Sequence, residues 1–222
     1  MVSPSNHERT CDTVPGEERE GVRISVELLV ATRNAGKVRE IRKALRGLGL
    51  RILSLHDFRD VPEMEEDGRS FAENAMKKAR FYSKAFGRLT VSDDSGLEVD
   101  FLRGAPGIYS ARFAGEKVSD RENNLKLLRR MEGVSLSKRG ARFKCAIAIV
   151  SPDGRETVVE GECGGRVGLK EVGKKGFGYD PLFIFPRLRK TMAQLNLEEK
   201  NEISHRGKAL RKFRKIIGRF LG

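Results

Sequence analysis

The sequence predicts an α/β protein, and three features lead to this prediction. A dense apolar run over residues 24–31 is typical of a buried strand, and an amphipathic helix follows it at once. A shorter apolar run at residues 89–91 indicates the end of a second strand. Later in the chain, residues 143–149 and 157–162 flank a strong turn at residues 151–154, which predicts an antiparallel β-hairpin.

Length and composition limit the class of protein. At 222 residues the chain can bury a full core in one domain or divide into two lobes. Apolar residues make up 38% and charged residues 34%, as in a globular protein with a heavily charged surface. No window approaches the roughly 20 apolar residues that a membrane-spanning helix requires, which excludes a transmembrane protein. Cys11, Cys145 and Cys163 have neither CxxC spacing nor an even count, which favours a reducing, cytoplasmic location and argues against structural zinc.

The first 24 residues carry almost no aliphatic pattern, and we expect them to form a disordered N-terminal extension. This extension lacks the apolar segment of a secretory signal, and its acidic residues exclude a transit peptide. The remainder shows no internal repeat. Residues 25–222 are therefore predicted to form a single domain.

The turn between the first strand and the first helix has a composition that suits phosphate. The helix places Val38, Ile41, Leu45 and Leu48 at helical spacing. The turn before it, residues 32–37, supplies a hydroxyl, an amide, small residues and a lysine at the positive end of the helix. It lacks the spacing of a Walker A loop. A helix capped by an asparagine, with an exposed lysine, explains the same residues, so both interpretations stay open.

Two adjacent carboxylates, Asp93 and Asp94, follow the second strand. We expect that strand to end near Val91, and strand ends are where α/β proteins gather their chemistry. The upstream loop at residues 62–68 is rich in acids. Because Mg²⁺ is held by one or two carboxylates together with substrate phosphates, one acid from each segment would suffice. Solvated turns are the competing interpretation of both segments.

Capping residues mark three further helices. Ser70 with Glu73 and Ser119 with Glu122 have the spacing of capping boxes, and Ser204 is a natural N-cap for a C-terminal helix with a basic outer face.

A glycine-rich loop at residues 173–181 bears Phe177 and Tyr179. Such aromatic side chains either stack on a base or cap the core from a surface turn. Residues 166–169 are consistent with one more short strand before this loop.

Together these segments resemble the inosine triphosphate pyrophosphatase family, whose members hydrolyse deaminated purine nucleoside triphosphates. The resemblance extends from about Leu28 to Leu210 and keeps the family's order of motifs. It rests on residues 31–40, 71–75 with 78–80, 92–99, 104–112, 177–183, 198–200 and 203–210.

The resemblance implies an elongated α/β fold in which two lobes around a mixed central sheet flank a nucleotide-binding cleft, usually in a homodimer. It implies hydrolysis of a nucleoside triphosphate to the monophosphate and pyrophosphate. Asp94 would be the general base and a ligand of Mg²⁺. Glu65 would be the second ligand, with Glu66, Asp67 and Asp93 as alternatives. The substrate would contact Thr32, Arg33, Asn34, Ala35, Gly36, Lys37, Ser95, Phe177, Gly178, Tyr179, Asp180, Lys200, His205 and Arg206.

The chemistry of these residue types agrees with that reaction. A triphosphate brings several negative charges, which Lys37, Lys200, Arg206 and a divalent ion would offset. General base action by Asp94 contributes about 10²- to 10⁴-fold. Arg206 would donate to the 6-keto oxygen of hypoxanthine or xanthine, whereas adenine would leave that donor unpaired at a cost of about 1–3 kcal/mol. Guanine shares the 6-keto group, so its rejection needs a contact near its 2-amino group.

Two other functions are weighed against this one. A net charge of +13 suggests a nucleic-acid binder. Because the basic residues are spread along helix faces and no motif that reads DNA or RNA occurs, we expect no nucleic-acid partner. A pyrophosphatase of the Maf type is a nearer alternative, and residues 177–180 and 204–206 argue against it.

Overall fold

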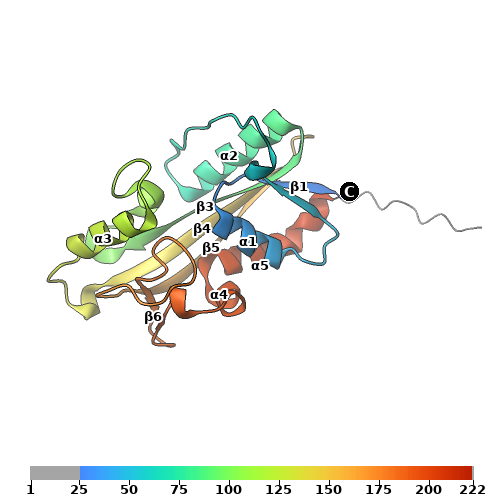
Figure 1. Ribbon diagram of the computed structural model, residues 1–222. Helices are drawn as coiled ribbons and strands as arrows, with labels where there is room; N and C mark the ends of the chain where they lie inside the picture. The colour runs from blue at the N-terminus through green and yellow to red at the C-terminus, as the bar shows by residue number, and fades with distance from the viewer. Residues whose placement is uncertain (1–25, 222) are drawn as a thin grey trace, which may run out of the picture.

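The computed structural model describes residues 26–221, whose centre is a seven-stranded sheet with helices on both faces (Figure 1). The predicted disordered extension, residues 1–24, lies outside the described residues, as does the start of the strand predicted from residue 24. The sheet has the order β2-β1-β3-β4-β5-β6-β7. The strands are β1 (Glu27–Val30), β2 (Arg51–Ser54), β3 (Leu89–Val99), β4 (Gly140–Val150), β5 (Glu156–Val167), β6 (Phe183–Phe185) and β7 (Lys190–Thr191).

The sheet is mixed, as the sequence analysis expected. β1 pairs in parallel with β2 and β3, whereas β3, β4, β5, β6 and β7 pair antiparallel with one another in that order. The predicted hairpin is present as β4 and β5, in which Ile147 faces Val159.

Five α-helices pack on this sheet within the described residues. They are α1 (Ala35–Ala44), α2 (Phe71–Phe86), α3 (Asp120–Arg130), α4 (Leu197–Ile203) and α5 (His205–Ile216). α2 covers one face of β3 and β4, and α1 and α5 cover the other (Figure 1). The alternation of β4 explains this division, because Ile147 and Ile149 pack with α1 and α5 while Ala146 and Ala148 pack with α2.

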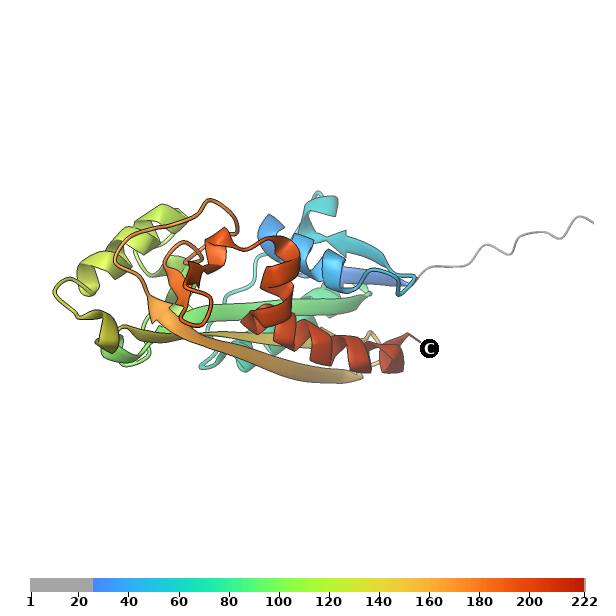
Figure 2. The same cartoon turned by 90° about the horizontal axis from the view of Figure 1, so that it is seen from below.

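The long strands β3, β4 and β5 give the molecule its elongated shape (Figure 2). Their far ends carry a second apolar cluster that joins Leu97 of β3, Leu127 of α3, the C-cap residue Met131 and Phe183 of β6. The expected elongated α/β architecture is therefore confirmed. None of the helices among residues 26–221 combines the length and apolar character that crossing a bilayer demands.

The end predicted for β3 is wrong. We expected its end near Val91, but the strand continues to Val99. Only the parallel pairing with β1 stops at Val91, because antiparallel pairing with β4 supports the polar residues that follow. The two aspartates therefore lie inside a strand.

Two smaller expectations also need correction. Arg166 and Val167 are the last residues of β5 rather than part of a separate strand. Ser70 does cap α2, but the carboxylate of Glu73 accepts from Arg69 N, so no reciprocal capping box forms there. The capping box of α3 and the Ser204 cap of α5 are confirmed.

Candidate active site

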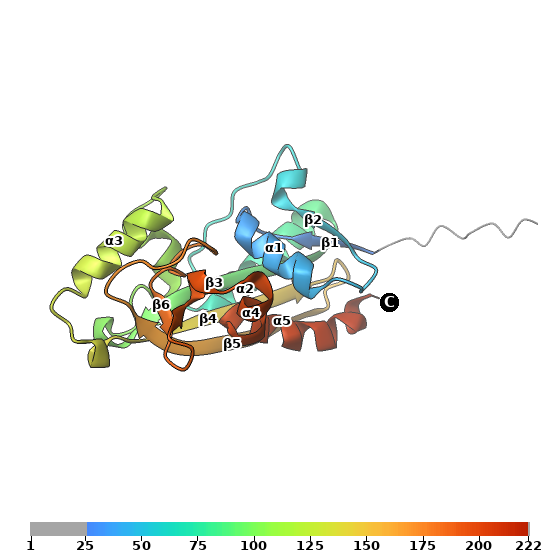
Figure 3. The same cartoon turned by 60° about the horizontal axis from the view of Figure 1, so that its bottom comes forward.

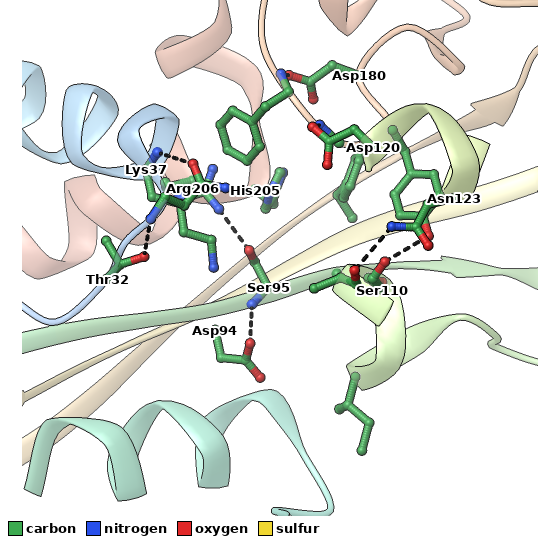
Figure 4. Close-up of a pocket in the computed structure, with 18 of the residues that line it drawn as sticks. Thr32, Lys37, Asp94, Ser95, Ser110, Asp120, Asn123, Asp180, His205 and Arg206 are labelled. Carbon is green, nitrogen blue, oxygen red and sulfur yellow. Dashed lines mark hydrogen bonds between the residues drawn. The ribbon is translucent and has the colours of Figure 1, made fainter. Parts of the chain in front are cut away.

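A cavity of about 220 Å³ opens beside β3 where its neighbour β1 stops. Because β1 pairs with β3 only as far as Val91, the next residues of β3 have no strand on that edge, although β4 still pairs with them on the other. Residues from β3, α3, α5, the turn before α1 and the loop before β6 line the cavity (Figure 4). The cavity therefore joins parts of the chain that are far apart in the sequence.

The turn before α1 forms one end of this cavity. Asn34 is the N-cap of α1, and its side-chain oxygen accepts a hydrogen bond from Lys37 N at 3.1 Å. The backbone N–H of Asn34 donates to Thr32 Oγ1, also at 3.1 Å. Lys37 and Lys78 both line the cavity near the positive end of the helix. This end therefore suits a phosphate group.

Asp94 lies on the α2 side of the sheet and lines the cavity. One carboxylate oxygen accepts from Asn74 Nδ2 at 3.2 Å, and the other accepts from Ser95 N at 3.0 Å. Burial raises the pKa of Asp94 above its usual range, although Lys37 and Lys78 act in the opposite direction. A carboxylate of this kind in a cleft is suited to accept a proton.

Asp93 leaves β3 on the other face and is fully buried. Its Oδ2 lies 2.8 Å from Arg206 Nε, and its Oδ1 lies 2.5 Å from Lys37 Nζ. The Cys145 thiol also donates to Oδ2, at 3.0 Å. Burial alone would raise the pKa of Asp93, but Arg206 and Lys37 hold it well below its usual range. Both oxygens are engaged, so Asp93 holds two cations in place.

Arg206 continues this contact into a buried chain of alternating charges. Its Nη1 lies 2.6 Å from Glu40 Oε2. The other Glu40 oxygen lies 2.7 Å from Lys200 Nζ, which is 2.5 Å from Asp180 Oδ2. Burial would raise the pKa of Glu40, but Arg206 and Lys200 lower it below its usual value. This chain of alternating charges runs from Lys37 through Asp93, Arg206, Glu40 and Lys200 to Asp180.

Phe177 packs between the turn and these cations. A Cβ atom on Gly36 would lie only 2.3 Å from Cδ1 of the Phe177 ring, so the ring lies directly against the backbone. Lys200 Nζ is 4.5 Å and Arg206 Cζ is 5.3 Å from the ring centroid, within the range of a cation–π interaction. Tyr179 is buried, and its hydroxyl donates to the Ser110 carbonyl at 2.8 Å.

His205 completes the wall beside Arg206 (Figure 4). Its ring stacks on Phe143 with 4.6 Å between the ring centroids and 12° between the planes. Burial, together with the charges of Arg206 and Lys200, holds the pKa of His205 well below its usual range. The imidazole is therefore neutral at physiological pH.

The cavity brings together most of the residues that the sequence predicted for the site, which are Thr32, Asn34, Lys37, Asp94, Ser95, Phe177, Gly178, Tyr179, Asp180, His205 and Arg206. Gly36 and Lys200 lie against Phe177 and do not line the cavity. Arg33 and Ala35 are exposed on the turn. Of the acidic loop, Glu66 lines the cavity, whereas Glu65 is exposed.

Several residues in or beside the cavity were given no role from the sequence. Lys78 forms an ion pair with Glu66 and lines the cavity, and Asn74 binds Asp94 from the previous turn of α2. Their spacing of four residues, which places both on one face of a helix, was the available signal. Asp120 at the start of α3 also lines the cavity, but nothing in its local sequence distinguishes it from an ordinary first-turn acid.

Comparisons with known proteins identify relatives of this chain. The model of the Ham1 family matches residues 28–216. The dITP/XTP pyrophosphatase of Desulforamulus reducens is 50% identical over 194 residues, which cover 87% of this chain and 96% of that protein. The dITP/XTP pyrophosphatase of Geobacter sulfurreducens is 50% identical over 191 residues, or 86% of this chain and 96% of that protein. The solved HAM1 protein from Coxiella burnetii has a TM-score of 0.78 and 37% identity over 87% of this chain and 99% of its own.

The fold, the site and these relatives together define a nucleoside triphosphate pyrophosphatase, a hydrolase of phosphoric anhydride bonds. The chain belongs to the Ham1 family, which confirms the resemblance drawn from the sequence motifs.

Proposed function

We propose that this chain hydrolyses the deaminated purine nucleoside triphosphates ITP, dITP and XTP to the monophosphate and pyrophosphate. The observation that carries the proposal is one cavity with a cationic helix end, a buried carboxylate in the middle and an aromatic loop with neutral and cationic donors at the other end. The triphosphate would lie at the cationic helix end, the bond to be broken would lie beside the buried carboxylate, and the base would lie at the aromatic loop. The names of the relatives support the choice of substrate.

The phosphate chain would lie against the turn before α1. Backbone N–H groups of residues 35 and 36, together with Lys37 and Lys78, would bind its oxygens. Asp93 keeps Lys37 oriented, because one carboxylate oxygen lies 2.5 Å from the ammonium group.

Asp94 would accept the proton of the attacking water. Its raised pKa brings it closer to the pH at which a general base is effective. Asp94 and Glu66 present carboxylate oxygens to the same cavity, and with phosphate oxygens they form the hard donor set that suits Mg²⁺. When bound, Mg²⁺ would offset phosphate charge and stabilise the departing pyrophosphate. Glu65 is exposed, and both Asp93 oxygens are engaged by cations, so we favour Asp94 and Glu66 as ligands.

The base would lie near Phe177, His205 and Arg206. Arg206 has five N–H donors and spends four hydrogen bonds on Asp93, Glu40 and Ser95, which leaves one for the substrate. A single fixed donor suits a 6-keto oxygen and opposes the 6-amino group of adenine.

The family resemblance also supports a homodimer of one two-lobed domain over residues 25–222. Light scattering after gel filtration would test this oligomeric state.

A substrate panel assayed for pyrophosphate tests this function. With Mg²⁺, the purified protein should release pyrophosphate from ITP, dITP and XTP far faster than from ATP or GTP. Equal rates on all purine triphosphates would contradict the proposed selectivity.

The Asp94→Asn variant tests the proposed base. It should lose turnover and still bind ITP in calorimetry, because the amide has nearly the shape of the carboxylate and its one oxygen still accepts a hydrogen bond from Asn74 or from Ser95. Retained turnover would remove Asp94 from the mechanism.

A further inference from the structure

α3 holds the loop that carries Phe177. The backbone N–H of Gly178 donates to Asp120 Oδ2 at 2.6 Å, and the Gly178 carbonyl accepts from Asn124 Nδ2 at 3.1 Å. The backbone N–H and carbonyl of Gly178 are thus both bound by side chains that lie one turn apart on α3. Figure 3 shows this loop between β5 and β6, with α3 on one side and α4 on the other.

The orientation of Asn124 is set by its surroundings. Its Nδ2 also donates to Glu171 Oε1 at 2.6 Å, so the amide faces two acceptors and must present its nitrogen to both. The side chain is 2% exposed. Among the described residues its Oδ1 has no hydrogen-bond partner, which is the cost of directing the donor to the loop.

The residues on either side of Gly178 are fixed as well. Gly178 has a φ of 59°, a left-handed conformation that turns the chain between two packed aromatic side chains. On one side, Phe177 lies against Gly36 in the first turn of α1. On the other side, Tyr179 binds the carbonyl of Ser110 at 2.8 Å. A displacement of Gly178 would therefore move the Phe177 ring relative to the phosphate end of the cavity.

We propose that Asp120 and Asn124 are positioning residues that hold Gly178, and through it the Phe177 ring, at the base end of the active-site cavity. Asp120 lines this cavity together with His205 and Arg206 (Figure 4). The role rests on the proposed function, because it assigns Phe177 to the base and the turn before α1 to the phosphates. It deepens that function by making base binding, and not phosphate binding, depend on α3.

Replacement of Asp120 separates the hydrogen bond from the charge. Asp120→Ala removes the acceptor for Gly178 N, and we expect KM for ITP to rise about fivefold, the usual effect of one lost hydrogen bond, with kcat within about twofold. Asp120→Asn keeps an acceptor oxygen and should restore KM to near the wild-type value. Inorganic tripolyphosphate, which has no base, should inhibit all three proteins equally.

A matched control tests whether any weakening of α3 has the same effect. Glu122→Ala breaks the capping box with Ser119 at the same helix end but touches no residue of the loop. It should lower thermal stability and leave KM for ITP unchanged. Equal rises in KM for Glu122→Ala and Asp120→Ala, or failure of Asp120→Asn to restore KM, would overturn the proposal.

Amide hydrogen exchange gives a readout that needs no substrate. In Asp120→Ala the Gly178 amide should exchange about fivefold faster than in the wild type, and in Asp120→Asn it should not. Unchanged exchange in Asp120→Ala would contradict the positioning role. A wild-type protein that shows the expected exchange but releases no pyrophosphate from ITP would instead contradict the proposed function.

Discussion

Asp93 and Asp94 are neighbours in β3, yet their side chains leave the strand on opposite faces. Asp93 pairs in register with Ile147 on the side of α1 and α5, and its carboxylate binds Arg206 and Lys37. Asp94 lies on the side of α2, where Asn74 donates to it. The alternation of a strand therefore divides two identical side chains into one that holds cations and one that faces the cavity.

This division predicts that Asp93→Asn will destabilise the protein. The amide would leave Lys37 without its carboxylate partner and Arg206 with Glu40 alone. Removing one partner of a buried ion pair costs about 3–5 kcal/mol. Urea denaturation at pH 7 should show a loss of this size in the free energy of unfolding. Asp153→Asn, which breaks an exposed pair with Arg155, is the control and should leave it nearly unchanged. A loss no larger than that of the control would show that the buried pair contributes little.

Glu40→Gln should lower both stability and turnover. Glu40 binds Arg206 with one oxygen and Lys200 with the other, so the neutral amide would loosen both cations beside Phe177. We expect kcat/KM for ITP to fall at least tenfold, about 1.4 kcal/mol of transition-state stabilisation. Steady-state kinetics check this, with the exposed Glu202→Gln as control. A wild-type value of kcat/KM in Glu40→Gln would exclude a role in turnover for the buried chain of alternating charges.

Local sequence was enough to predict what depends on local chemistry. The capping box of α3, the Ser204 cap, the hairpin of β4 and β5 and the turn before α1 are all set by residues close together in the chain. The length of β3 was not predictable in this way. Its polar residues resemble a turn, and they form a strand because β4 pairs with them from some 50 residues away.

The motifs that carry the family resemblance contain most of the site, but they do not give every residue in them a role. Glu40 lies in the motif of residues 31–40 and was given none, because in α1 it stands among basic residues and resembles a surface charge. Its buried partners, Lys200 and Arg206, come from the other end of the chain, and Arg206 is 166 residues away. Glu66 and Glu65 could not be separated, since the fold of the acidic loop decides which carboxylate enters the cavity.

Gly96→Ala should destabilise the protein and impair the site. Gly96 lies in β3, where a Cβ atom would come within 2.4 Å of both the Gly107 carbonyl oxygen and Ser110 Oγ. Such overpacking costs about 1–3 kcal/mol. Urea denaturation should show this loss, with slower pyrophosphate release from ITP. Gly164→Ala in β5, where a Cβ atom would have no close neighbour, should leave both unchanged. Equal effects of the two substitutions would contradict the close packing at Gly96.

His205 should make stability depend on pH between about 7.5 and 5.5. Burial and the neighbouring cations keep the folded imidazole neutral, whereas the unfolded chain binds a proton near the ordinary pKa of about 6.5. The unfolded state thus takes up more protons as the pH falls, so the stability that His205 contributes is present above pH 6.5 and is lost below it. For one such group the loss across this window is about 1.4 kcal/mol.

Urea denaturation of the wild type and His205→Gln at both pH values checks this. Between pH 7.5 and 5.5 the free energy of unfolding of the variant should fall by about 1.4 kcal/mol less than that of the wild type, whatever the absolute stability of the variant. The exposed His56→Gln variant is the control and should keep the wild-type dependence. An unchanged dependence in His205→Gln would mean that the folded imidazole takes up a proton over the same pH range as the unfolded one, and at the lower pH it would then face the cavity as a cation beside Arg206.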